Sequence, residues 1–171
     1  MDFRKVLSSD SSRLITNMVI DGINNDPGKF AEVMKIIDTA APPVNWRAAK
    51  AIDLCCEHHP ELLHPWIEMI VNNIDKTNHD STLRSYLRML SRYTGQMNED
   101  QLGIIFDFSF ETLFNENKAV AIRYYAMEIM VNVAKREPAL KNEIMAALEE
   151  LLPRSTPTFK NAIRRSIKKT E

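Results

Sequence analysis

The chain has 171 residues, of which 44% are apolar and 26% are charged, and its formal net charge at pH 7 is −1. This composition is ordinary for one soluble domain and excludes an intrinsically disordered chain. Only four glycines are present, too few for a fold built on tight β-hairpins, so we expect an all-α protein.

The predicted helices follow from apolar residues that recur every three or four positions. Taken in chain order, they cover residues 11–24, 27–39, 45–58, 61–75, 80–93, 99–114, 118–136, 139–152 and 157–169. We also expect a short extra turn before Ser9. Pro27, Pro60 and Pro138 mark three helix starts, because the donor that proline lacks would be unpaired in the first turn. Asn98 is the expected N-cap of a fourth helix.

A repeating unit is visible in the second helix of each predicted hairpin, which contains an apolar residue followed by arginine. The segments are WRAAKAI, LRSYLRML, IRYYAMEIM and IRRSI, with Arg47, Arg84, Arg123 and Arg164. These arginines are separated by 37, 39 and 41 residues, and Arg13 lies 34 residues before the first. A single hairpin cannot bury its own apolar stripe, so the period predicts stacked hairpins in one domain over residues 1–171.

These units resemble HEAT repeats of the armadillo-type superhelical group over nearly the whole chain. The order DFRKVLSSDSSRLI, NWRAAKAIDL, HDSTLRSYL and FKNAIRRSIKK resembles short bacterial HEAT-like proteins. Some of those carry the name adenylosuccinate lyase, but the mobile-loop signature of that enzyme, which leads to Lys-x-Asn-Pro, is absent here. The resemblance implies a right-handed α-α superhelix of about four hairpins whose second helices line the concave surface.

The resemblance also implies a structural role for the four repeat arginines, which in the family pair with acidic residues near the turns. Asp80 lies four residues before Arg84, and Glu116 lies seven before Arg123, so both are candidate partners. Before Arg47 the nearest acidic residue is Asp38, and two prolines intervene.

Ten polar residues of the second helices form the candidate partner-binding surface. They are Lys50, Asp53, Arg84, Arg88, Arg92, Tyr124, Tyr125, Glu128, Asn132 and Lys135. The three arginines are spaced by four, so they form a basic stripe on one helix. By resemblance, this stripe faces the groove where ligands bind. The simpler interpretation is a solvated face on which Asp80 pairs with Arg84.

No motif of a known enzyme class is present: the chain lacks a glycine-rich phosphate loop, a G-x-S-x-G segment and an H-E-x-x-H segment. We therefore expect no catalytic residue and no cofactor. The preferred hypothesis is a non-enzymatic scaffold that binds another protein on its concave face, as a monomer or a weak homodimer.

The alternative is a nucleic-acid-binding protein that uses the arginine stripe and the basic C-terminal helix. From Pro153 onward the chain has six basic residues and one acidic residue. Nucleic acid is the less favoured partner, because the pI of about 6.4 lacks the basic bias of such proteins. A HEAT-like DNA glycosylase would need an aromatic residue and a carboxylate in the groove, and Trp46 with Asp53 is the pair that fits.

The hexapeptide CCEHHP, from Cys55 to Pro60, contains both cysteines of the chain and two of its four histidines. Cys55 and His59 are four residues apart and share a helix face, but two ligands do not make a zinc site. His64 and His79 would have to complete it. We expect no metal: the cysteines fill apolar space, and the histidines belong to the polar last turn of a helix.

A cytoplasmic location without a membrane span is expected. The longest apolar stretch, from Tyr124 to Ala134, contains Glu128 and Asn132 and is too short to cross a bilayer. The N-terminal residues lack the apolar core of a signal peptide. Two adjacent cysteines cannot join distant parts of a fold, which is typical of a reducing compartment.

Overall fold

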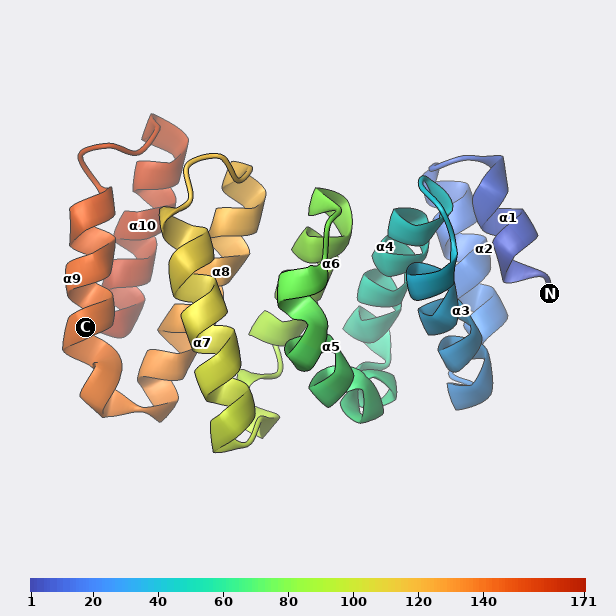
Figure 1. Cartoon of the computed structure of the whole chain (residues 1–171), viewed down its shortest axis with the longest axis horizontal. Coiled ribbons are helices and arrows are strands. Elements are labelled where there is room, and N and C mark those ends of the chain that lie inside the picture. Colours follow the sequence, from blue (N-terminus) through green and yellow to red (C-terminus); the bar gives the residue numbers. More distant parts are fainter. The chain divides into compact units, whose positions relative to one another are not determined.

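The computed structural model describes every residue from Met1 to Glu171, and its regular structure is helical throughout (Figure 1). The α-helices are α1 Phe3–Ser9, α2 Arg13–Ile23, α3 Pro27–Thr39, α4 Val44–His58, α5 Ile67–Asn73, α6 Asp80–Ser91, α7 Glu99–Phe114, α8 Val120–Arg136, α9 Lys141–Leu151 and α10 Pro157–Thr170. The 3-10 helices are η1 Pro60–Trp66, η2 Ile74–Lys76, η3 Thr94–Gln96 and η4 Pro138–Leu140. The prediction of an all-α protein is confirmed.

Two of the predicted helix starts are confirmed with the expected chemistry. Pro27 is the first residue of α3, and the Asp26 carboxylate accepts hydrogen bonds from two backbone N–H groups of the first turn. Asn98 caps α7, and its side chain and that of Gln101 bind one another's backbone N–H groups. Such reciprocal caps satisfy two donors that a helix start leaves unpaired.

The helix predicted over residues 61–75 is wrong in its detail, because η1, α5 and η2 replace it. Pro65 lies inside η1 and has no backbone N–H, so a continuous α-helix through this segment would lose a hydrogen bond and clash with the preceding turn. Pro138 likewise begins a 3-10 helix before α9. The expected turn before Ser9 is a full helix, α1, which Asp2 caps and which buries Phe3 and Leu7.

Contacts between Cα atoms divide the chain into two compact units. The first contains Met1–Ile70 and Thr77–Met89, and the second contains Val71–Lys76 and Leu90–Glu171. The division passes through α5 and α6. A single domain over residues 1–171 stays a prediction.

Helix α4 is the centre of the first unit, where it packs against α1, α2 and α3. Its inner face consists of small residues and one isoleucine, and Ala48, Ala49, Ala51 and Ile52 are fully buried. Alanines let neighbouring helices approach closely, while Phe30 of α3 supplies bulk to the same core.

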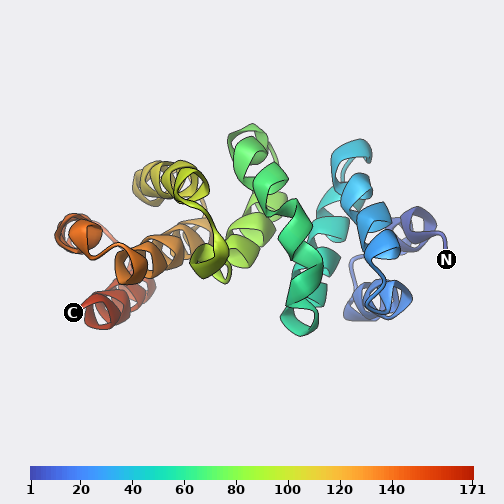
Figure 2. The ribbon, with the colours of Figure 1, turned by 90° about the horizontal axis from the view of Figure 1, so that it is seen from below.

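Helix α8 has the corresponding position in the second unit. It packs against α7, α9 and α10, and Figure 2 shows α8 among these three helices. Its buried residues include Met127 and Met130, which share one core with Leu148 of α9 and with Phe159 and Ile163 of α10. The hairpins α7–α8 and α9–α10 each consist of antiparallel helices joined by a short turn (Figure 1).

None of the helices is both long enough and apolar enough to span a lipid bilayer.

Candidate functional site

Two of the four repeat arginines bind backbone carbonyl groups at the ends of neighbouring helices. Arg47 Nη1 donates to the Leu7 carbonyl at 2.9 Å, and Arg123 Nε donates to the Leu113 carbonyl at 2.8 Å. Both carbonyls lie in the last turn of a helix, where no intrahelical donor remains. Arg123 also lies over the ring of Phe159, with 4.9 Å between the guanidinium carbon and the ring centroid.

Acidic residues play a smaller part at these arginines than the resemblance implies. Burial lowers the pKa of Arg123, and the nearby charge of Glu116 acts in the opposite direction. Arg84 is exposed on α6 and makes neither a hydrogen bond nor an ion pair. Arg164 is also exposed, and it contacts only Asn161, at 3.4 Å. The repeat arginines thus differ in burial: Arg123 is buried, Arg47 is half-buried, and Arg84 and Arg164 are exposed.

In the first unit, the candidate residues of α4 and α6 form an ion-pair cluster. Arg88 Nη1 donates to Asp53 Oδ2 at 2.7 Å, and Arg88 Nη2 donates to the Glu57 carboxylate. Only 6% of the Asp53 side chain is exposed, compared with 35% for Glu57. Lys50, one turn before Asp53 on α4, is half-buried. Arg88 and Asp53 therefore hold α6 against α4, and their charges largely neutralise one another.

The ion pair between Arg88 and Asp53 weighs against the DNA glycosylase alternative. Trp46 stacks on His79 with ring centroids 6.1 Å apart and an interplanar angle of 11°, and Arg47 lies over the same indole. Asp53 is held in its ion pair with Arg88. A carboxylate neutralised by a bound guanidinium is a poor base. This pair offers neither an open stacking surface nor an unpaired carboxylate.

In the second unit, several candidate residues meet in one open cleft of about 700 Å³ between α8 and the segment that follows α6. Its lining consists of Ser91, Arg92, Thr94, Gly95, Glu128, Asn132, Lys135 and Arg136. We call it the basic cleft, because it contains three cationic side chains and one carboxylate. Four of the ten sequence-predicted residues lie here: Arg92, Glu128, Asn132 and Lys135.

Hydrogen bonds hold several residues that line the basic cleft in place. Asn132 Nδ2 donates to the Ser91 carbonyl at 2.8 Å, and Lys135 Nζ lies 3.3 Å from Asn132 Oδ1. Glu128 is 3.4 Å from Lys169 Nζ, which offsets its charge. Asn132 thus has a structural role, while Lys135 stays at the exposed surface.

Sequence reasoning missed Arg136, which is the third cation of the cleft. It donates to the carbonyls of Thr94 and Met97, so it connects α8 to both ends of η3. Its spacing of four from Asn132 is the signal that would have found it, because such residues share a helix face.

The two tyrosines of α8 lie one helical turn before Glu128. Tyr124 and Tyr125 meet edge to face, with ring centroids 5.3 Å apart. Burial raises the pKa of Tyr124, and the charge of Glu128 and a hydrogen bond to it act in the same direction. Both rings are half-buried, so they extend the surface next to Glu128 with aromatic area.

The CCEHHP segment ends α4, as its alignment with the other turns indicates. Cys55 and Cys56 are buried and form no disulfide, and His59 lies 3.5 Å from Glu61. Burial raises the pKa of the Cys55 thiol to about 11, and Glu61 adds to this shift. The structure contains no group of three or more histidine, cysteine, aspartate or glutamate side chains arranged to hold a metal ion.

Helical hairpins of about forty residues, with an arginine of the second helix bound to a neighbouring helix end, define an all-α repeat protein. The chain belongs to the HEAT repeat domain family, whose model matches residues 3–170. The resemblance to HEAT repeats is confirmed, and so is the all-α solenoid fold class. No curated protein matches the chain, and no solved structure matches it. HEAT repeats are commonly protein-interaction scaffolds, and the family is generally non-enzymatic.

Replacing Arg123 with alanine should lower the free energy of unfolding by about 2 to 4 kcal/mol, because the buried Leu113 carbonyl loses its donor and Phe159 loses its cation. The matched control is Arg164→Ala, at the equivalent position of the last repeat. Since Arg164 is exposed, we expect a change within about 0.5 kcal/mol. Urea titrations followed by circular dichroism measure both, and equal effects would show that the carbonyl contact contributes nothing.

Asp53 and Glu57, the two carboxylate partners of Arg88, provide a second matched pair of variants. Asp53→Ala leaves Arg88 without its buried partner and should destabilise the fold by about 1 to 3 kcal/mol. Glu57→Ala removes a partly exposed partner and should cost less than about 1 kcal/mol. Thermal unfolding of the two variants checks the order, and a larger loss for Glu57→Ala would contradict it.

The raised pKa of Cys55 predicts a loss of stability in alkali. The unfolded chain releases the thiol proton from about pH 9.0, whereas the folded chain retains it to about pH 11. Stability from this group is therefore complete below pH 9 and falls by about 2 to 3 kcal/mol as the pH rises to about 11. The measurement is urea unfolding of the wild type and of Cys55→Ala over this range. Parallel curves for the two proteins would contradict the assignment.

Proposed function

We propose that the chain is a non-enzymatic scaffold that binds another protein through the exposed side chains of its second helices. The observation that carries the proposal is the basic cleft, where four of the predicted residues line one concavity: Arg92, just after α6, and three residues of α8. The partner binds on the concave face of the repeats in this proposal. The protein acts in the cytoplasm as a monomer or a weak homodimer.

The charge of the basic cleft favours an acidic segment of the partner. Arg92, Lys135 and Arg136 line the cleft with cationic side chains, although Arg136 Nε also lies 3.9 Å from Glu137, and Lys169 offsets the charge of Glu128. Charges arranged in this way steer an oppositely charged partner and fix its orientation. Tyr124 and Tyr125 add aromatic area nearby, and tyrosine and arginine are the residue types that dominate interface energies.

In the first unit, Arg84 is a better position than Arg88 for a charge-reversal test of binding. Arg88 is bound to Asp53 and Glu57, so its reversal to glutamate would place three carboxylates together and destabilise the protein. Arg84 is exposed and makes no ion pair, so its reversal changes the surface without this penalty.

Lys135→Glu and Arg84→Glu should each reduce the amount of a specific crosslinked partner by roughly tenfold or more, because both remove exposed charges from the proposed binding surface. The measurement is affinity capture with crosslinking from the native cell, with partner peptides quantified by mass spectrometry. Lys29→Glu on α3 is the control, since this lysine lies outside the proposed surface. Capture of the same proteins in the same amounts by the wild type and by all three variants would contradict the proposal.

Nucleic acid is the second candidate, favoured by the exposed cations of α10. Arg164, Arg165, Lys168 and Lys169 are all exposed, although Lys169 is paired with Glu128. The pairing of Arg88 with two carboxylates removes the central cation of the α6 stripe, which weighs against this candidate. Anisotropy of labelled DNA and RNA separates the two functions: tight binding that falls steeply with salt favours nucleic acid.

A further inference from the structure

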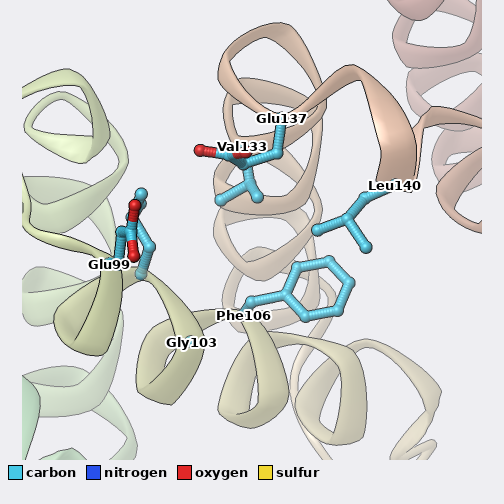
Figure 3. A pocket seen from close by; sticks show the side chains of 7 residues that line it. Glu99, Gly103, Phe106, Val133, Glu137 and Leu140 are labelled. Atoms are coloured by element: carbon cyan, nitrogen blue, oxygen red, sulfur yellow. The ribbon is translucent and has the colours of Figure 1, made fainter.

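A second concavity lies in the second unit, between the first half of α7 and the end of α8. It has a volume of about 270 Å³, and its walls are mainly apolar: Leu102, Phe106, Val133 and Leu140. We call it the apolar groove. Figure 3 shows Phe106 and Leu140 on one side of it and the carboxylates of Glu99 and Glu137 toward the other. None of its lining residues belongs to the basic cleft.

Gly103 lines the groove and has no side chain to fill it. Gly103 lies within α7, does not have a positive φ, and a Cβ atom added there would meet nothing within 4 Å. Neither backbone conformation nor close packing therefore requires glycine here. Glycine destabilises a helix interior relative to alanine, so this residue weakens α7, and it leaves open space where a side chain would stand.

The surroundings of the groove are acidic and apolar. Helix α7 contains four acidic residues and no basic residue: its charged positions are Glu99, Asp100, Asp107 and Glu111. Ile104, next to Gly103, is one of the few large apolar residues with an exposed side chain, at 43%. Glu137 is 3.9 Å from Arg136 Nε, and an ion pair this long between partly exposed side chains is weak.

Size and charge together identify the kind of occupant. Pockets for drug-sized ligands range from about 300 to 1,000 Å³, so a groove of about 270 Å³ suits one or two amino-acid side chains better. An apolar side chain against Gly103 and Phe106 would leave its chain neighbours next to Glu99 and Glu137. Lysine or arginine at those neighbours complements both carboxylates.

We propose that the apolar groove binds a short basic segment of a partner protein, with one leucine-sized or phenylalanine-sized side chain seated at Gly103 and cations at Glu99 and Glu137. This surface is separate from the basic cleft and has the opposite charge. The scaffold thus selects two chemically different segments, acidic in one place and basic in the other.

The probe is a panel of fluorescein-labelled peptides in which one leucine or phenylalanine stands between two Lys-Arg pairs. Matched peptides contain alanine at the apolar position or Glu-Glu flanks. The basic peptides with an apolar residue should bind at least about tenfold more tightly than either matched set. In ¹⁵N-labelled protein the Gly103 amide, one of four glycine amides, should shift on binding.

Two variants test the site itself. Gly103→Leu fills the groove from a position where a side chain meets no neighbour, so binding should fall about tenfold or more without a lower melting temperature. The double reversal of Glu99 and Glu137 to lysine should abolish binding of the basic peptides and create binding of the Glu-flanked ones. Glu111→Lys, on the same helix but outside the groove, should leave the affinity unchanged.

The proposal is overturned if no peptide shifts the Gly103 amide at millimolar concentration, or if Gly103→Leu binds the basic peptides as the wild type does. Sedimentation of the wild type and Gly103→Leu tests a second copy as the occupant. Self-association that only the wild type shows would assign the groove to a homodimer instead. Lys135→Glu, in the basic cleft, should not alter peptide binding, so failure of this proposal and failure of the proposed function are distinguishable.

Discussion

Every helix end exposes carbonyl groups that have no donor within the helix, and in this chain side chains of α4 and α8 supply several of the missing donors. Arg47 of α4 binds such a carbonyl of α1, and Arg123 of α8 binds one of α7. Further along α8, Asn132 binds the carbonyl of Ser91 at the end of α6, and Arg136 binds carbonyls of η3. A single helix thereby fixes the ends of three neighbouring elements, which determines both the packing of the second unit and the surface that α8 exposes.

The same bonds decide which side chains are left for recognition. Asn132 and Arg88 are engaged within the protein, whereas Lys135 and Arg84 project from it. Because consecutive positions on a helix point about 100° apart, the C-terminal half of α8 contributes to two different surfaces. Glu128, Asn132, Lys135 and Arg136 of α8 line the basic cleft. Val133 and Glu137 of the same helix line the apolar groove. Opposite charge on adjacent faces allows a small repeat domain to discriminate between two kinds of segment without a second binding domain.

Features with a local cause could be predicted from the sequence. The start of α3 at Pro27 and the cap at Asn98 each depend on residues within one turn, and the period of the arginines can be read directly from the sequence. The carbonyl partners of Arg47 and Arg123 could not be predicted, because every residue has a carbonyl group and the relevant one depends on packing. The apolar groove was missed for a similar reason: the absent side chain of Gly103 matters only through residues thirty or more positions away, and one glycine in a helix gives no sign of them.

Both tryptophans of the chain, Trp46 and Trp66, belong to the first compact unit, and the second unit contains none. Tryptophan emission therefore reports on the first unit alone, while the helical circular dichroism signal comes from both. In repeat proteins, neighbouring units are coupled mainly through the interface that they share, so their unfolding transitions coincide only when that coupling is strong. The natural placement of two indole rings thus gives this protein a built-in spectroscopic measure of how cooperatively its repeats unfold.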